Sequence, residues 1–325
     1  MPASVAGMPG VPPTRFVYLG PESTFTEQAL LTIPAAVKGI RTPVRSVPEA
    51  LDAVRDGEAD AALVPWENSI GGAVGVTLDE LAEGDPLVIT RDVVIPVEFV
   101  LAAKAGKKLS EIRSIAAHPQ ASTQCRSWLR AHTPDATIVD VLSNGAAAAA
   151  AGNGEHDAAI CAPIAIERFG LNRLADKIAD HPDAVTRFVL LSRPGPPPEP
   201  TGDDITSLAI WISHDRVGAL LAVLTELAVR GVNLTRIESR PTGEKLGRYV
   251  FFLECTGHVA EARVGEALQG LRRVCAEVRF LGSYHRAAQP GAIAERPVPP
   301  PPGLSDSDYA DSAAWLRRLR RGELG

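Results

Sequence analysis

Several classes of protein are excluded by what this 325-residue chain has little of. Aromatic residues make up 5% of it, too few for the stacking platforms that bind single-stranded nucleic acid. The net charge of −6 comes without a polybasic run, which disfavours nucleic acids and anionic membranes as partners. No apolar run approaches the roughly 20 residues of a membrane-spanning helix. The N-terminus lacks the basic and apolar regions of a secretory signal, so we expect a cytoplasmic protein.

Cysteine and histidine are also sparse. The four cysteines form no C-x-x-C pair, and the seven histidines form no H-x-x-x-H motif and no cluster with cysteine. A chain of this length can bury a core without disulfides, so we expect reduced thiols. We predict no structural or catalytic metal. The sequence also has no P-loop and no G-x-S-x-G, and we predict no cofactor.

What the chain does contain is a regular alternation of strand-like and helix-like stretches over residues 14–193. This alternation predicts an α/β fold with mostly parallel sheets. The long β-rich stretch at 87–103 is expected to cross between two lobes. The strand over 187–192 is expected to return to the first lobe. Junctions of this kind typically hold ligands.

The remaining residues differ in composition. Residues 194–204 are Pro-rich and read as a linker, and residues 1–13 read as a flexible extension. Residues 205–286 predict the order β-α-β-β-α-β, with a turn at 242–248. Residues 287–325 are Pro-rich and then charged, and we interpret them as a tail with one short docking helix.

Polar or Gly-rich residues follow three of the predicted strands, where a helix is about to begin. They lie in GPESTFTEQAL (20–30), ENSIGG (67–72) and HPQASTQ (118–124). Helix N-termini with nearby hydroxyls suit an anion, although ordinary N-caps and turns use the same residues. Thr186 and Arg187 stand at the start of an apolar strand. They are either a strand end that reaches solvent or part of a ligand site. No nucleophile has a base beside it. A cleft lined by helix ends, hydroxyls and amides suits a small, doubly charged carboxylate ligand.

In this order, and together with TRFVLLS, VGALLAVL and NLTRIESRP, these motifs resemble prephenate dehydratase from about residue 15 to 286. The resemblance implies a two-lobed catalytic domain like a type 2 periplasmic binding protein, followed by a ferredoxin-like (βαββαβ) ACT domain. It implies conversion of prephenate to phenylpyruvate, water and carbon dioxide in phenylalanine biosynthesis. It also implies phenylalanine as allosteric effector and a homodimer or homotetramer.

With this resemblance, the candidate residues fall into three groups. Those expected to serve catalysis are Thr186, Arg187, Phe188, Asn68, Ser69 and Gln124. Those expected to bind substrate are Ser23, Thr24, Glu67, Gly71, Gly72 and His118. Those expected to bind phenylalanine are Gly218, Ala219, Leu220, Asn233, Leu234, Glu238 and Ser239. Thr186 is expected to donate to the departing hydroxyl, while Asn68, Ser69 and the amides of Gly71 and Gly72 hold substrate carboxylates.

Two other functions remain open from the sequence. One is an arogenate dehydratase, whose substrate differs from prephenate by an amino group in place of a keto group. The other is a non-catalytic amino-acid sensor with the same two-lobed plan. Assays of the purified protein with prephenate and with arogenate distinguish these functions. We also expect deletion of residues 205–286 to leave a weaker enzyme that no longer responds to phenylalanine.

Overall fold

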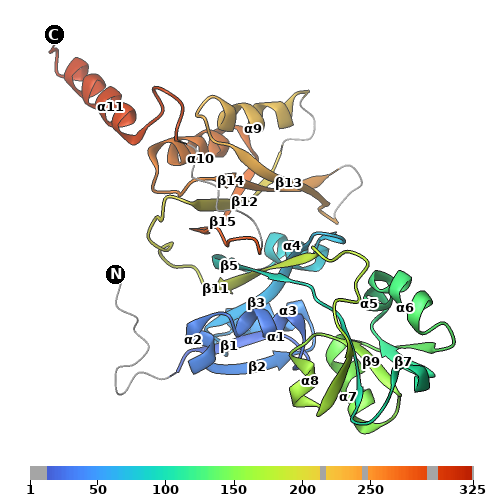
Figure 1. The fold of residues 1–325 in the computed structure, drawn as a ribbon. Coiled ribbons are helices and arrows are strands. Elements are labelled where there is room, and N and C mark those ends of the chain that lie inside the picture. The colour runs from blue at the N-terminus through green and yellow to red at the C-terminus, as the bar shows by residue number, and fades with distance from the viewer. Residues whose placement is uncertain (1–12, 213–216, 244–247, 291–298, 324–325) are drawn as a thin grey trace. The chain divides into compact units, whose positions relative to one another are not determined.

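The computed structural model describes residues 13–212, 217–243, 248–290 and 299–323 (Figure 1). The chain forms two compact units. The first is drawn from residues 1–77 and 93–191, and the second from residues 78–92 and 192–325. The predicted extension at 1–13 lies almost wholly outside the described residues. Among those described, no helix is both long and apolar enough to cross a membrane.

The first lobe of the first unit is built on a sheet with the strand order β2-β1-β3-β11-β5, with β4 beside β3. Its strands are β1 (Arg15–Leu19), β2 (Ile40–Val44), β3 (Ala61–Asn68), β4 (Gly72–Ala73), β5 (Val88–Pro96) and β11 (Val185–Ser192). Its helices are α1 (Phe25–Leu30), α2 (Pro34–Lys38) and α3 (Val47–Arg55). In α3, apolar residues at helical spacing face the sheet, and Ser46 caps the first turn. Helix α4 (Gly75–Glu83) follows β4.

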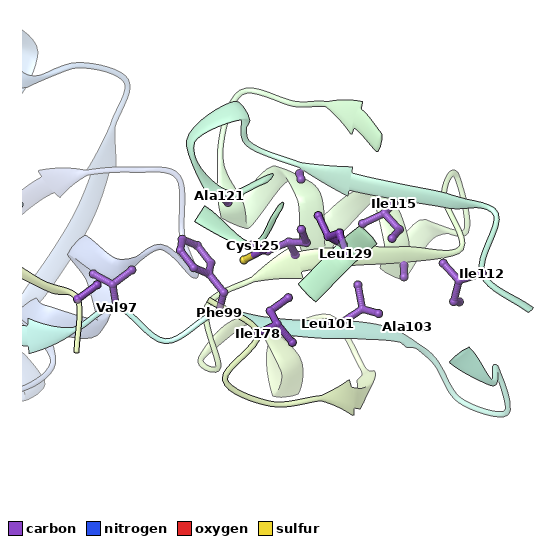
Figure 2. Close-up of a cluster of buried hydrophobic side chains, with 14 residues drawn as sticks. Val97, Phe99, Leu101, Ala103, Ile112, Ile115, Ala121, Cys125, Leu129 and Ile178 are labelled. Carbon is purple, nitrogen blue, oxygen red and sulfur yellow. The ribbon is translucent and has the colours of Figure 1, made fainter. Parts of the chain in front are cut away.

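The second lobe has the strand order β10-β6-β9-β7-β8. Its strands are β6 (Val100–Lys104), β7 (Ser114–Ala117), β8 (Thr137–Asp140), β9 (Ala158–Cys161) and β10 (Leu171–Ala175). Its helices are η1 (Leu109–Glu111), α5 (Pro119–Gln124), α6 (Arg126–His132), α7 (Asn144–Asn153) and α8 (Ala165–Arg168). Figure 2 shows one of its cores, in which Leu101 and Ile115 meet Cys125 and Leu129. The Ala-rich α7 packs on the alanines of β6, β7 and β9 in another core.

Two chain segments cross between the lobes side by side. The Val97 N–H donates to the Ala184 carbonyl at 2.8 Å, and the Ile178 N–H donates to the Phe99 carbonyl at 3.1 Å. The predicted crossover at 87–103 is therefore confirmed, as is the return of the last strand to the first lobe. The prediction of mostly parallel sheets is wrong. Strand β11 re-enters the first sheet where β3 ends, so it must run antiparallel to β3.

The second unit contains an antiparallel sheet with the order β13-β14-β12-β15. Its strands are β12 (Asp204–Trp211), β13 (Leu234–Pro241), β14 (Tyr249–Thr256) and β15 (Glu277–His285), and its helices are α9 (Ala219–Ala228) and α10 (Ala262–Val274). Both helices pack apolar residues against the sheet, among them Val223 and Leu227 of α9 and Ala267 and Leu271 of α10. The predicted β-α-β-β-α-β order is confirmed. Residues 244–247 of the predicted turn lie outside the described residues.

The same unit includes residues 78–92, which the C-terminal sheet holds through polar contacts. Arg240 forms a bidentate ion pair with Asp79 of α4, with distances of 2.9 and 2.6 Å. Arg279 donates to two carbonyls at the end of α4, each at 2.9 Å. The Ala287 N–H donates to Asp92 at 2.7 Å. Most of α4 and the start of β5 therefore belong with the C-terminal domain.

The tail contains a longer helix than predicted. Helix α11 (Asp306–Arg320) has 15 residues and starts with a capping box between Ser305 and Asp308. Its first turn is joined to α10, because the Ala262 N–H donates to Asp306 at 2.8 Å. The tail is therefore docked on the C-terminal domain at the start of α11.

Candidate active site

The site is centred on a hydrogen bond between two neighbouring strands of the first lobe. Asn68 at the end of β3 lies opposite Thr186 at the start of β11. The Asn68 Nδ2 donates to Thr186 Oγ1 at 2.8 Å. Thr186 is 9% exposed, so its hydroxyl lies where little water competes for it. The pair joins residues 118 positions apart in the chain.

The orientation of the Asn68 amide is fixed by its surroundings. Its Oδ1 accepts the backbone N–H groups of Ile70 and Gly71, both at 2.9 Å. Two donors at one end identify that end as the oxygen, so the amide nitrogen must face Thr186. A threonine oxygen that accepts from Asn68 directs its own proton elsewhere. Thr186 is therefore poised as a hydrogen-bond donor.

The loop after β3 is held to β11 by Ser69. The Ser69 N–H donates to the Val185 carbonyl at 3.0 Å, and the Val185 N–H donates to Ser69 Oγ at 3.0 Å. Gly72, which has φ +73°, lies opposite Asn68 in the short β4 ladder. The Gly71 N–H is already engaged by Asn68, so it is not free for a substrate carboxylate as the sequence suggested.

A β-bulge in β3 follows the pairing of Asn68 with Thr186. The register shifts between Arg187 and Phe188, which lies opposite Pro65, so the extra residue is Trp66 of β3. Arg187 lies opposite Glu67 in the ladder. Phe188 is 2% exposed and packs in the core of the first lobe with Phe16 and Tyr18. Its ring is buried in that core and is therefore not exposed to a ligand.

The second lobe contributes the helix that begins after β7. His118 is the N-cap of α5, and its Nδ1 accepts the Gln120 N–H at 3.2 Å. The Gln120 side-chain amide approaches Gly71, at 3.5 Å from where a Cβ on that glycine would lie. Gln124 is 8% exposed, and its Oε1 has no hydrogen-bond partner among the residues the structure describes. A buried amide oxygen left in this state is an available acceptor for a ligand.

The first loop of the first lobe holds Ser23 and Thr24. Thr24 is the N-cap of α1, and its Oγ1 accepts the Glu27 N–H. Ser23 is 1% exposed and has φ +65°, a conformation that L-residues rarely adopt. The structure adds Glu27 and Arg168 to this group, which the sequence analysis did not select. Arg168 lies in the second lobe without a local sequence signal.

The cysteines offer no nucleophile. All four are free thiols. Burial raises the pKa of Cys125, Cys161 and Cys255 to about 12, so these thiols remain protonated at neutral pH. We therefore assign none of these three cysteines to the candidate site.

The residues predicted to bind phenylalanine lie in the second unit. Gly218 has φ +77° and is the N-cap of α9, whose first turn contains Ala219 and Leu220. Asn233 and Leu234 line a pocket of about 450 Å³ between α9 and the start of β13. Glu238 and Ser239 lie further along β13, and neither they nor Gly218 line this pocket.

Comparison with known proteins gives the same two parts. A family model for prephenate dehydratase matches residues 16–196, and a model for the ACT domain matches residues 206–273. The prephenate dehydratase of Amycolatopsis methanolica is 46% identical over 311 residues, which cover 95% of this chain and 99% of the relative.

Solved structures share the fold over most of the chain. The prephenate dehydratase of Arthrobacter aurescens in complex with L-Phe has a TM-score of 0.87 and 45% identity, covering 94% of this chain and 99% of that one. GqqA, described as a novel type of quorum quenching acylase, has a TM-score of 0.74 and 26% identity, covering 84% and 98%.

The fold and the site thus define an enzyme with a two-lobed α/β catalytic domain and a C-terminal ACT domain. The chain belongs to the prephenate dehydratase family, which consists of hydro-lyases. The resemblance found in the sequence motifs is confirmed.

The unpaired amide oxygen of Gln124 leads to a testable expectation. Gln124→Met removes a buried acceptor without a partner, which costs about 1–3 kcal/mol when it stays unsatisfied. The substrate-free protein should therefore keep or raise its melting temperature, while kcat/KM falls by about tenfold or more because a ligand contact is lost. Thermal unfolding and steady-state kinetics measure the two effects.

Gln28 provides a matched control for this substitution. Its Oε1 is also buried without a partner in the described structure, but Gln28 belongs to no candidate group. Gln28→Met should change stability without changing kinetics. Equal kinetics for the Gln124→Met variant and the wild type would exclude Gln124 from substrate binding.

Proposed function

We propose that this chain converts prephenate to phenylpyruvate, with Thr186 as the donor to the departing hydroxyl. In this reaction the electron pair of the bond to the ring carboxylate moves into the ring. Carbon dioxide leaves, and the opposite carbon releases its hydroxyl, which leaves as water after gaining a proton. The ring becomes aromatic, so the thermodynamic drive lies in the substrate. The protein has to bind, orient and assist the leaving group.

The hydrogen bond from Asn68 to Thr186 is the observation that carries this proposal. Because Thr186 Oγ1 accepts from Asn68, its own proton can point at the substrate. A prepositioned donor at the atom where negative charge develops can contribute about 3–4 kcal/mol, or 10²–10³ in rate. The low exposure of Thr186 strengthens the contact, because water does not screen it.

Other residues are proposed to place the substrate. Gln124 supplies an unpaired acceptor that suits the hydrogen of the substrate hydroxyl. Ser69 Oγ accepts the Val185 N–H and so can direct its own proton to a substrate carboxylate. Ser23, Thr24, His118 and Arg187 complete the proposed set. We assign Asn68 and Gly71 to positioning Thr186. The Gly71 N–H donates to Asn68 Oδ1, and the Asn68 Nδ2 donates to Thr186.

Assays of the purified full chain on prephenate and on arogenate test the proposal. We expect the protein to convert prephenate to phenylpyruvate much faster than it turns over arogenate. An assay for acylase activity belongs in the same experiment, because one protein of this fold is described as an acylase. If the protein binds phenylalanine but turns over neither prephenate nor arogenate, an amino-acid sensor remains as its function.

We further propose that phenylalanine regulates the enzyme through the ACT domain and that the protein is a cytoplasmic homodimer or homotetramer. The effector assignment is supported by the related structure in complex with L-Phe. An effector can act only through a difference in affinity between two states. Phenylalanine is therefore expected to favour a less active state.

Gly218→Leu tests the effector site. Gly218 has φ +77°, so a leucine there is strained and adds a branched side chain at the start of α9. We expect calorimetry to show weaker phenylalanine binding, and inhibition curves to shift to higher phenylalanine by about tenfold or more.

Gly202→Leu is a suitable control for this substitution. Gly202 has a similar φ of +88° and, like Gly218, has no atom within 4 Å of a Cβ position. It should show the same backbone strain with normal inhibition. If both variants bind phenylalanine like the wild type, the effector site lies elsewhere.

A further inference from the structure

Arg168 joins the two lobes of the catalytic unit. It is the last residue of α8 in the second lobe, and its guanidinium reaches two carboxylates of the first lobe. Its Nη1 lies 3.3 Å from Glu27 Oε1, and its Nη2 forms an ion pair with Glu22. A side chain that contacts both carboxylates links α8 to the loop between β1 and α1.

Glu27 is the buried member of this cluster. Its side chain is 9% exposed, and its carboxylate accepts the Ser23 N–H. Burial, the charges of Glu27 and Glu22, and a hydrogen bond with Glu27 raise the pKa of Tyr18 above its ordinary value. A buried carboxylate needs a cation as well as hydrogen bonds, and Arg168 supplies that charge. The conformation of Ser23 thus depends on Glu27, and Glu27 depends on the second lobe.

Two further contacts show that this loop faces the second lobe. The rings of Phe25 and Phe99 meet edge to face with centroids 5.3 Å apart. Phe99 belongs to a core of the second lobe (Figure 2). Gly145 of α7 packs so closely on the Glu22 carbonyl that a Cβ there would overlap it. Residues 22–27 are therefore the segment through which the first lobe meets α7, α8 and Phe99.

We propose that Arg168 is a positioning residue that holds the lobes together and keeps Ser23 and Thr24 in place for the substrate. This inference rests on the proposed function, in which Ser23 and Thr24 touch the substrate. When a ligand binds only one arrangement of a protein, its apparent affinity falls with the population of that arrangement. Loss of Arg168 should therefore raise KM. The kcat should persist, because Asn68 and Thr186 do not contact Arg168.

Kinetics of Arg168→Gln and Arg168→Lys test this role against Arg173→Gln. Arg173 lies in the same lobe, is similarly exposed, and pairs locally with Asp176 at 2.6 Å. We expect KM to rise about five- to tenfold in the Arg168→Gln variant, with kcat within about twofold of the wild type. The KM of the Arg168→Lys variant should lie between those of the wild type and the Arg168→Gln variant, because a compact ammonium cannot match the planar guanidinium in binding carboxylates. The Arg173→Gln variant should keep the wild-type KM.

Hydrogen exchange over residues 22–27 provides a readout that does not need activity. Exchange should be faster in the Arg168→Gln variant than in the Arg173→Gln variant, because Glu27 loses its cation and releases the Ser23 N–H. If the wild type fails to turn over prephenate while this difference is present, the proposed function fails and the link between the lobes stands. Equal exchange in the two variants, an unchanged KM, or a fall in kcat alone would overturn the proposal.

Discussion

Replacing Thr186 with alanine is expected to lower kcat by about 10²–10³-fold while the protein folds normally. The Thr186 side chain is the proposed donor, which Asn68 orients, and alanine has no hydroxyl proton to donate. KM should change much less, because the contact strengthens as charge develops on the leaving oxygen. Steady-state kinetics and circular dichroism of the purified variant measure the two parts of this expectation.

Two further substitutions make the test of Thr186 sharper. Thr186→Ser keeps the hydroxyl and should retain much more activity than the alanine variant. Thr186→Val keeps the shape without the donor and should be as slow as alanine. A folded Thr186→Val variant with near wild-type kcat would remove Thr186 from the mechanism.

Asn68→Asp should be more damaging to kcat than Asn68→Ala, although aspartate is nearly the same size. A carboxylate cannot donate to Thr186 Oγ1 and accepts the Thr186 proton instead. The proton needed by the leaving group is then captured within the protein. We expect a loss of about 10²-fold or more for the aspartate variant, comparable with loss of the donor itself. Alanine leaves Thr186 mobile but able to donate.

The pH dependence of the Asn68→Asp variant gives a second signature. A protonated carboxyl can donate to Thr186 again, so part of the lost activity should return as pH falls toward about 4, the ordinary pKa of aspartate. The alanine variant should show no such recovery. Asn172→Asp, at an exposed position of β10, controls for the added charge. Higher activity for the aspartate variant than for alanine at neutral pH would contradict the proposed orientation of Thr186.

The fold was largely predictable because its signals are local. Alternating strands and helices, and the change of pattern after residue 204, follow from periodicity within single elements. The antiparallel return of β11 was not predictable in this way. Its direction depends on where the chain re-enters the first sheet after a whole second lobe. Strand β10 also escaped prediction, because LNRLA is short and has two exposed polar residues.

The site was predictable as residue types but not as a set of bonds. A polar loop after a buried strand selected Asn68, and a polar pair before one selected Thr186. No local sequence feature indicated that Asn68 Oδ1 would accept a hydrogen bond from the Gly71 N–H. Glu27 has capping-box spacing from Thr24, but its carboxylate accepts the N–H of Ser23, whose φ is +65°. Its partner Arg168 lies 141 residues away.

The grouping of residues 78–92 with the C-terminal domain has a practical consequence for protein engineering. A chain cut in the linker at 194–204 keeps Asp79, the end of α4 and Asp92 but loses Arg240, Arg279 and the backbone that hold them. The sequence suggested that such a deletion yields a weaker, unregulated enzyme. With these partners removed, residues 78–92 lose the contacts that hold them, so we expect the deletion variant to be less stable than the full chain as well as weaker and unresponsive to phenylalanine. If phenylalanine regulates this enzyme as proposed, a single substitution such as Gly218→Leu is a better way to remove that response than deletion of the C-terminal domain, because it leaves the partners of residues 78–92 in place.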